Sequence, residues 1–177
     1  MVRTGVGRIM KFFVKFLSVV LLLGVVGCSN YRLAGTPINL PFKSVYVEPV
    51  KNFSYAPQAS NLLTNAISDA ISQTPQIKVA NKSDADAVLS VTITDYRKTP
   101  YATNSKDTAL AASYKMYMTA SCTLTMGSKI IFKDRPVHCD MILNARDGNF
   151  INNEYQSMPI ITRDLGVKIK DAVIGIW

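Results

Sequence analysis

Apolar and polar side chains alternate without interruption over residues 114–126. The apolar set is Tyr114, Met116, Met118, Ala120, Cys122, Leu124 and Met126, and the polar set is Lys115, Tyr117, Thr119, Ser121, Thr123 and Thr125. A period of two is typical of a β-strand with one face in a core and the other toward water. Gly127-Ser128 then favours a two-residue hairpin turn, so we expect the next strand to pair with this one.

The returning strand, residues 129–143, changes phase partway along. Its early apolar residues include Ile130 and Phe132, whereas the later ones are Val137, Cys139, Met141 and Leu143. The change falls at Asp134-Arg135-Pro136, and proline cannot donate a hydrogen bond to a ladder. We therefore expect a β-bulge or an unpaired edge there.

The hairpin register also predicts the state of two cysteines. Counting back from the turn pairs Cys122 with Lys133 and leaves Cys139 six residues further along the strand. That separation is roughly 20 Å, whereas the Cα atoms of a disulfide lie within about 7 Å. We therefore expect two separate buried thiols.

Two segments have the period of an amphipathic helix. The first runs from Pro57 to Thr74, and the second begins near Ser157 and Pro159. The buried face of the first is Ala59, Leu62, Leu63, Ala66, Ile67, Ala70 and Ile71, and that of the second is Ile161, Leu165, Ile169, Ala172, Val173 and Ile176.

Shorter extended segments complete the order of elements. Residues 44–48 and 86–96 are predicted strands, and residues 77–79 a short extended piece. Residues 97–112 are expected to form a long loop, and residues 144–156 a polar connection with a turn at Asp147-Gly148. The order β-α-β-β-β-α predicts an α+β, two-layer sandwich in which two helices pack on a mixed four-stranded sheet.

The N-terminus has the layout of an export signal. The first 15 residues are basic without an acid, and an apolar run from Phe16 to Val26 follows. Val25-Val26-Gly27-Cys28 resembles a bacterial lipobox, in which the cysteine is acylated (with palmitate, for example) before cleavage. We expect a signal peptide at residues 1–27, a lipidated tether at 28–41 and one domain at 42–177. By the same resemblance, Ser29 favours the outer membrane.

Composition and motifs exclude several classes of function. The net charge of +8 includes four charges in the signal, and the chain has no long basic run, so nucleic acid is not an expected partner. The single histidine, His138, lies beside Asp140 on the predicted outer face of a strand, and this pair makes neither a metal site nor a triad. No phosphate loop, GxSxG or CxxC is present. The sequence predicts neither an enzyme nor a cofactor.

The order of these features resembles the lipopolysaccharide-assembly lipoprotein family (LptE-like). The residues that carry the resemblance are Cys28, Tyr31, Leu33 and Gly35; Leu40-Pro41; Val45-Tyr46-Val47; Asn52, Tyr55 and Pro57; Leu62-Leu63-Thr64-Asn65-Ala66; Ala85-Asp86-Ala87-Val88-Leu89; Asp95-Tyr96-Arg97; and the final helix ending at Trp177. Asn30, near the cysteine, departs from the small residue that the family often has there.

The resemblance implies an outer-membrane lipoprotein that plugs a large β-barrel translocon (LptD-like), assists its folding and contacts lipopolysaccharide. Because lipid A is anionic, basic side chains are the expected contacts. The candidates are Arg97, Lys98 and Lys106 on the expected loop, and Lys129, Lys133 and Arg135 on the hairpin. The alternative is a periplasm-facing scaffolding or binding lipoprotein of the cell envelope with another partner.

Overall fold

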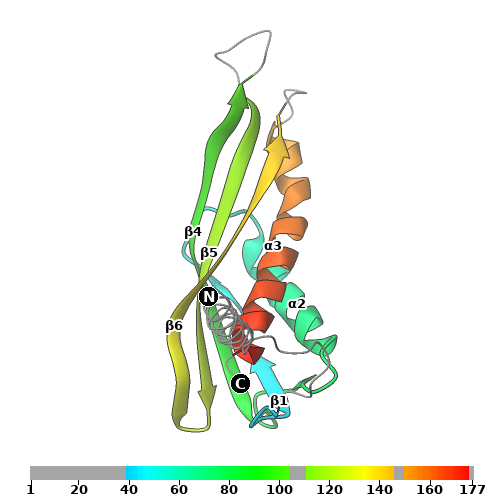
Figure 1. Ribbon diagram of the computed structural model, residues 1–177, viewed down its shortest axis with the longest axis vertical. Coiled ribbons are helices and arrows are strands. Elements are labelled where there is room, and N and C mark those ends of the chain that lie inside the picture. Colours follow the sequence, from blue (N-terminus) through cyan, green and yellow to red (C-terminus); the bar gives the residue numbers. More distant parts are fainter. Residues whose placement is uncertain (1–38, 104–110, 146–149, 176–177) are drawn as a thin grey trace, which may run out of the picture. The chain divides into compact units, whose positions relative to one another are not determined.

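The computed structural model describes residues 39–103, 111–145 and 150–175. The described elements are, in chain order, β1 (Ser44–Val47), β2 (Lys51–Asn52), α2 (Ala59–Ser72), β3 (Lys78–Val79), β4 (Ala87–Thr103), β5 (Ala111–Met126), β6 (Lys129–Asn144) and α3 (Phe150–Ile174) (Figure 1). None of the helices within these ranges is both long and apolar enough to cross a membrane.

The strands form one mixed sheet in the order β3-β1-β4-β5-β6, with β2 also paired to β4. β1 and β2 run parallel to β4, whereas β4, β5 and β6 are antiparallel neighbours. The predicted α+β class is confirmed. The sheet has six strands rather than four, because residues 51–52 and 78–79 add short parallel pairings.

Both helices and one face of the sheet enclose a single core. α2 buries Leu63, Ile67 and Ile71, and α3 buries Leu165 and Ile169, as their periodicity predicts. Ile176 of the predicted stripe lies outside the described residues. Figure 1 shows α2 beside one end of the sheet, whereas α3 and the three long strands continue beyond it. One end of the sheet is therefore covered by two helices and the other by one.

The expected long loop at residues 97–112 is wrong for most of its length. β4 continues to Thr103 and β5 begins at Ala111. The alternation in the sequence is lost because β4 has a register shift between Ile93 and Asp95, so Thr94 is an extra residue. Beyond this bulge the two faces of the strand exchange positions, and a strict period-two pattern cannot extend across it.

The second helix begins seven residues earlier than Ser157, the residue at which the sequence places its start. Residues 150–156 belong to α3, and Pro159 lies inside the helix. A proline in a helix lacks one N–H group and usually marks a helix start. Here tertiary contacts of Glu154 and Phe150, described below, hold the preceding turns in place. The expected turn at Asp147-Gly148 lies outside the described residues.

The expected bulge in the returning strand is confirmed. Asp134 has a φ of 51°, and the register shifts twice opposite Leu124. Cys122 consequently faces Arg135, and the expected pairing with Lys133 is wrong because β6 accommodates two extra residues.

The two cysteines remain separate, as the sequence predicts. Cys139 pairs with Met118, and both thiols are free and buried. Burial raises the pKa of Cys122 and that of Cys139 to about 12. Thiols that stay protonated are poor nucleophiles.

We therefore expect neither thiol to react with a maleimide at pH 7 in the folded protein. A Cys28→Ser variant retains Cys122 and Cys139 as its two cysteines. After denaturation without reductant, mass spectrometry of this variant should show two maleimide labels. Fewer than two labels would mean that the thiols form a disulfide.

Candidate functional site

Two cations meet over one aromatic ring on the sheet face away from the helices. Arg97 of β4 and Lys115 of β5 lie 5.0 and 5.1 Å from the centroid of the Tyr117 ring. Arg97 pairs with Tyr117 across the strands, and Lys115 is the next residue of β5 on the same face. The bulge at Thr94 gives Arg97 this position, because it turns the neighbouring Tyr96 and Lys98 toward the helices.

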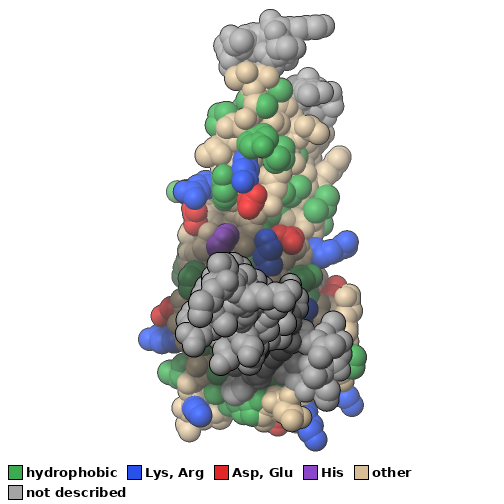
Figure 2. Space-filling model, in the orientation of Figure 1, with side chains coloured by type: hydrophobic (Ala, Val, Ile, Leu, Met, Phe, Trp, Pro, Cys, Tyr) green, Lys and Arg blue, Asp and Glu red, His purple; other side chains and the backbone are tan. Residues whose placement is uncertain are grey.

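Carboxylates accompany both cations. Lys115 Nζ lies 3.0 Å from Asp140, and Arg97 Nε lies 3.8 Å from Asp95. The hydrogen bond to Asp140 raises the pKa of Lys115 above its ordinary value of 10.5. Figure 2 shows basic and acidic side chains on this face around the chain's single histidine. His138 is exposed, as the sequence predicts.

Lys98 faces the opposite side of the sheet from Arg97. Its Nζ lies 3.0 and 2.9 Å from the two carboxylate oxygens of Glu154 on α3, and Tyr96 donates a hydrogen bond of 2.6 Å to the same carboxylate. Glu154 is buried, with 7% of its surface exposed. Burial, followed by the hydrogen bond to Glu154, strongly raises the pKa of Tyr96.

The same ammonium lies 5.0 Å from the ring of Phe150, which packs on Tyr114 at 4.7 Å. Lys98 therefore attaches the first turns of α3 to the sheet. The sequence did not indicate this role, because Glu154 stood in a segment expected to be an irregular connection.

Arg135 attaches the other end of α3. Its guanidinium donates a hydrogen bond of 3.2 Å to the carbonyl of Ala172 and lies 5.6 Å from the Phe132 ring. A cation near the last carbonyls of a helix also interacts favourably with the helix dipole. Two of the six candidate cations thus hold α3 on the sheet.

The remaining candidates do not converge on Arg97. Lys133 lies beside Thr123, six residues along β5 from Tyr117, a separation of about 20 Å. Lys129 pairs with Met126 still farther along the hairpin. Lys106 and the acylation candidate Cys28 lie outside the described residues. The sequence analysis did not select Lys115 as a candidate contact. The one sign of its position in the sequence is the alternation of residues 114–126, which places Lys115 on the same outer face as Tyr117.

Asp86, part of the Ala85–Leu89 block that carries the family resemblance, has a structural role. One of its carboxylate oxygens accepts hydrogen bonds from the Lys43 and Ser44 N–H groups, at 2.9 and 3.0 Å, and from the Ser44 hydroxyl at 2.8 Å. These bonds connect the start of β1 to the start of β4. They lower the pKa of Asp86 below the ordinary value of 3.8, the Lys43 N–H having the largest effect.

Because the pKa is lowered on folding, the stability contributed by Asp86 is present at neutral pH and is lost as the pH falls below about 3.8. We expect Asp86→Ala to lower the melting temperature at pH 7, and the difference from the parent to shrink at pH 3. Asp86→Asn retains an acceptor oxygen and should lose less. Thermal unfolding followed by circular dichroism at both pH values would test this, and a difference that does not depend on pH would contradict it.

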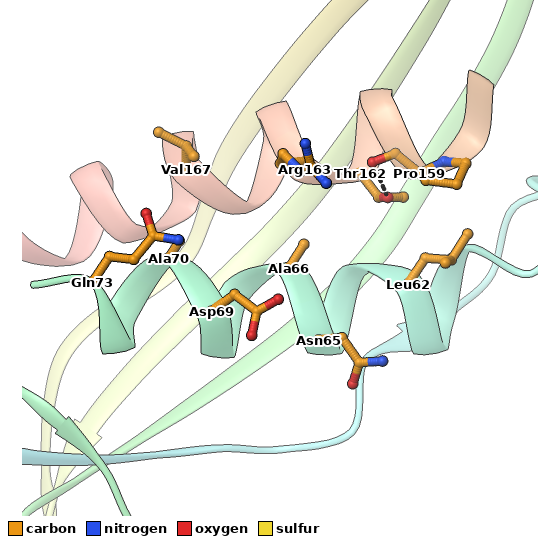
Figure 3. Close-up of a pocket in the computed structure, with 10 residues that line it drawn as sticks. All are labelled: Leu62, Asn65, Ala66, Asp69, Ala70, Gln73, Pro159, Thr162, Arg163 and Val167. Carbon is orange, nitrogen blue, oxygen red and sulfur yellow. Dashed lines mark hydrogen bonds between the residues drawn. The ribbon is translucent and has the colours of Figure 1, made fainter. Parts of the chain in front are cut away.

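A groove of about 390 Å³ separates α2 and α3 on the side away from the sheet. Figure 3 shows Leu62 and Pro159 at one end of the groove and Gln73 and Val167 at the other. Ala66 and Ala70 line it together with the polar side chains of Asn65, Asp69, Gln73 and Arg163. Within the described ranges, no group of three or more His, Cys, Asp or Glu side chains is arranged to hold a metal ion.

Comparison with solved structures shows a shared fold. A lipoprotein from Nitrosomonas europaea matches with a TM-score of 0.54 and 15% identity, over 82% of this chain and 91% of that one. A Xanthomonas campestris protein matches with a TM-score of 0.57 and 9% identity, over 81% and 90%. A minor lipoprotein from Acinetobacter baumannii matches with a TM-score of 0.50 and 15% identity, over 77% and 94%.

No curated protein matches the chain. The model of the LptE family, described as lipopolysaccharide-assembly, matches residues 42–166, which is more than half of the chain. The matched span begins before β1 and ends in α3, so it covers every strand of the sheet. The chain therefore belongs to the LptE family of lipopolysaccharide-assembly proteins.

Proposed function

We propose that this protein is an outer-membrane lipoprotein that plugs and helps assemble the lipopolysaccharide-export β-barrel and contacts lipopolysaccharide during its insertion into the outer leaflet. Family membership supports the general role in lipopolysaccharide assembly. The basic start, the apolar run and the lipobox-like sequence before Cys28 support an acylated anchor on the periplasmic side. In this proposal residues 1–27 are removed, residues 28–41 are the tether and residues 42–177 are the plugging domain.

The convergence of Arg97 and Lys115 on Tyr117 carries the proposed contact with lipopolysaccharide. A guanidinium and an ammonium within 5.1 Å of the centroid of one ring present several donors to a phosphate, such as those of lipid A. Arg97 and Asp95 form a weak, exposed ion pair at 3.8 Å, so a phosphate can replace Asp95 as the partner of Arg97 at little cost. Lys129 and Lys133 on the hairpin are a second group of candidate contacts, with fewer neighbours to orient them.

The sheet face around this cluster suits a wet barrel lumen. Beyond Tyr117 its β5 positions are Thr119, Ser121, Thr123 and Thr125, and the neighbouring β4 positions include Ser90 and Thr92. Hydroxyl side chains on a twisted sheet keep this face hydrated. A domain of this kind fits a polar interior rather than a lipid surface.

The contact is tested by the double variant Arg97→Ala/Lys115→Ala, with Lys78→Ala/Lys82→Ala as the matched control. Both double variants remove two positive charges from exposed or partly exposed positions, and neither Lys78 nor Lys82 is a candidate contact. We expect the first to weaken binding to immobilised lipopolysaccharide about tenfold or more and the second to change it less. Equal losses in both would point to net charge rather than to a site and would contradict the assignment.

The barrel partner is tested separately by affinity purification of the full lipidated chain from detergent-solubilised membranes. Recovery of a large barrel protein in a ratio near one to one is expected. Depletion of the chain should leave that barrel misassembled and should lower surface lipopolysaccharide. Normal barrel assembly and normal export after depletion would count against the proposal and in favour of a scaffolding lipoprotein with another partner.

A further inference from the structure

The segment between β2 and α2 is a loop held rigid by its own side chains. Asn52 accepts hydrogen bonds from the N–H and the hydroxyl of Ser54, at 2.9 and 2.7 Å, and its amide donates to the Ala56 carbonyl at 3.0 Å. The Ser54 hydroxyl also accepts from the Ala56 N–H at 3.2 Å. Ala56 itself is buried. The loop thus has one conformation fixed from within.

This rigid loop holds two aromatic side chains in solvent. Phe53 is 79% exposed and Tyr55 is 96% exposed, although their neighbours Asn52 and Ala56 are partly or fully buried. Aromatic side chains on a preorganised backbone bind with little loss of conformational entropy and are over-represented among the residues that dominate protein interfaces. An isolated exposed apolar residue needs no explanation, but two on one ordered loop do.

An open strand edge begins beside this loop. The Phe53 N–H donates to the Ile93 carbonyl at 3.0 Å, and β2 is paired to β4 only up to Ile93. β4 continues for ten residues, to Thr103, with no partner on that side among the described residues.

The bulge at Thr94 decides which backbone groups this edge presents. Ile93 directs its carbonyl toward β2. All of these residues lie opposite β5. Because one extra residue reverses the alternation, Tyr96, Lys98 and Pro100 direct their backbone groups to the open edge, whereas Asp95 and Arg97 direct theirs to β5. Pro100 has no N–H group and therefore occupies an edge position at no cost. Among the described residues, no strand on the open side pairs with the N–H and carbonyl groups of Tyr96 and Lys98.

We propose that the 52–58 loop and the open edge of β4 from Tyr96 to Pro100 together form a docking surface for an extended segment of a protein partner. The segment would lie beside β4 in line with β2, and Phe53 and Tyr55 would pack on its apolar side chains. This inference rests on the proposed function, in which the partner is the export barrel, and assigns the surface through which the two meet.

The backbone groups favour a polypeptide over a lipid as the occupant. A hydrocarbon chain can cover Phe53 and Tyr55, but it cannot satisfy the N–H and carbonyl groups of the adjacent edge. An added strand satisfies both, because main-chain hydrogen bonds supply affinity and alternate side chains supply specificity. Lys51 of β2 is exposed directly before the loop, so an occupant that carries a carboxylate near the loop is complementary in charge.

The experiment introduces the photo-crosslinking residue p-benzoylphenylalanine at position 53 or 55 in the full lipidated chain in its own membranes. Position 160 is the matched control, because Ile160 is 60% exposed on α3, away from the loop. We expect positions 53 and 55 to crosslink to the barrel protein, with the attachment points in one extended segment. In parallel, Phe53→Ala/Tyr55→Ala should lower recovery of the barrel about tenfold or more, whereas Ile160→Ala should not.

Each outcome decides a different question. Crosslinks from positions 53 and 55 to lipid alone, or unchanged recovery of the barrel with Phe53→Ala/Tyr55→Ala, would overturn the docking surface and leave the proposed function intact. If the unaltered chain recovers no barrel, the proposed function fails and this inference fails with it. Because both side chains are exposed, the variants should melt at the temperature of the parent, and circular dichroism checks that they do.

Discussion

Gly166→Leu should lower the melting temperature by about 10 °C, from a loss of about 3 kcal/mol in the free energy of unfolding. Gly166 is buried where α3 crosses α2, and a Cβ at this position would lie 2.9 Å from the Ala66 carbonyl carbon, 3.0 Å from its Cβ and 3.1 Å from its oxygen. Two of these atoms belong to the backbone, so the helices must separate. Leucine is a better helix former than glycine by about 1 kcal/mol, and a loss therefore reports packing alone.

Val167→Leu is the control for this substitution, because Val167 is the next residue of α3 and is 40% exposed. It should leave the melting temperature within about 2 °C of the parent, as surface changes usually do. Adding Ala66→Gly to Gly166→Leu should restore part of the loss, since it removes the Cβ contact but not the backbone contacts. Differential scanning calorimetry measures all three variants, and a Gly166→Leu protein that melts like the parent would show that the helices do not approach this closely.

Lys98→Met should cost about 2 kcal/mol of unfolding free energy at pH 7, because it leaves the buried carboxylate of Glu154 without its cation. The Lys98 side chain is 35% exposed, so water enters and keeps the cost below that of a fully buried pair. The loss should be largest in the first turns of α3. Hydrogen exchange followed by mass spectrometry should show faster exchange near residue 154 and little change in α2.

Replacing both partners separates the ion pair from the packing. In Lys98→Met/Glu154→Leu no charge is left buried, and Tyr96 can still donate to the Met116 sulfur, which lies 3.3 Å from its hydroxyl. The double variant should therefore be more stable than Lys98→Met alone, with a coupling of about 1–2 kcal/mol measured by urea denaturation. If the losses simply add, Lys98 and Glu154 do not act as a pair.

The fold followed from the sequence where periodicity was uninterrupted. Residues 114–126 formed the expected strand because each position obeys the same alternation, and the α2 face formed because its apolar residues keep the helical period. The parity change at residues 134–136 indicated a bulge or an unpaired edge, and the register shifts show the bulge. These are local signals, and each is read from neighbouring residues.

The errors arose where a distant contact overrides the local signal. Nothing near Glu154 in the sequence indicates that its carboxylate will meet Lys98 and Tyr96, so residues 150–156 looked like a connection. The candidate contacts were chosen by charge alone, whereas the sheet face that each basic side chain occupies depends on the strand register. Lys98 and Arg135 were therefore grouped with Arg97, although both contact α3, and Lys115 was left out.

Because Thr94 is an extra residue in β4, the number of residues in this strand decides which side chains lie on each of its faces. Deleting this one residue would leave every other side chain unchanged, yet it would exchange the environments of Arg97 and Lys98 and direct a different set of amide groups to the open edge. A substitution at position 94 would do none of this. For this strand, then, insertions and deletions of one residue are the changes most able to alter what the protein contacts, and a relative with a different residue count here would expose a different set of contacts even if its sequence were otherwise the same.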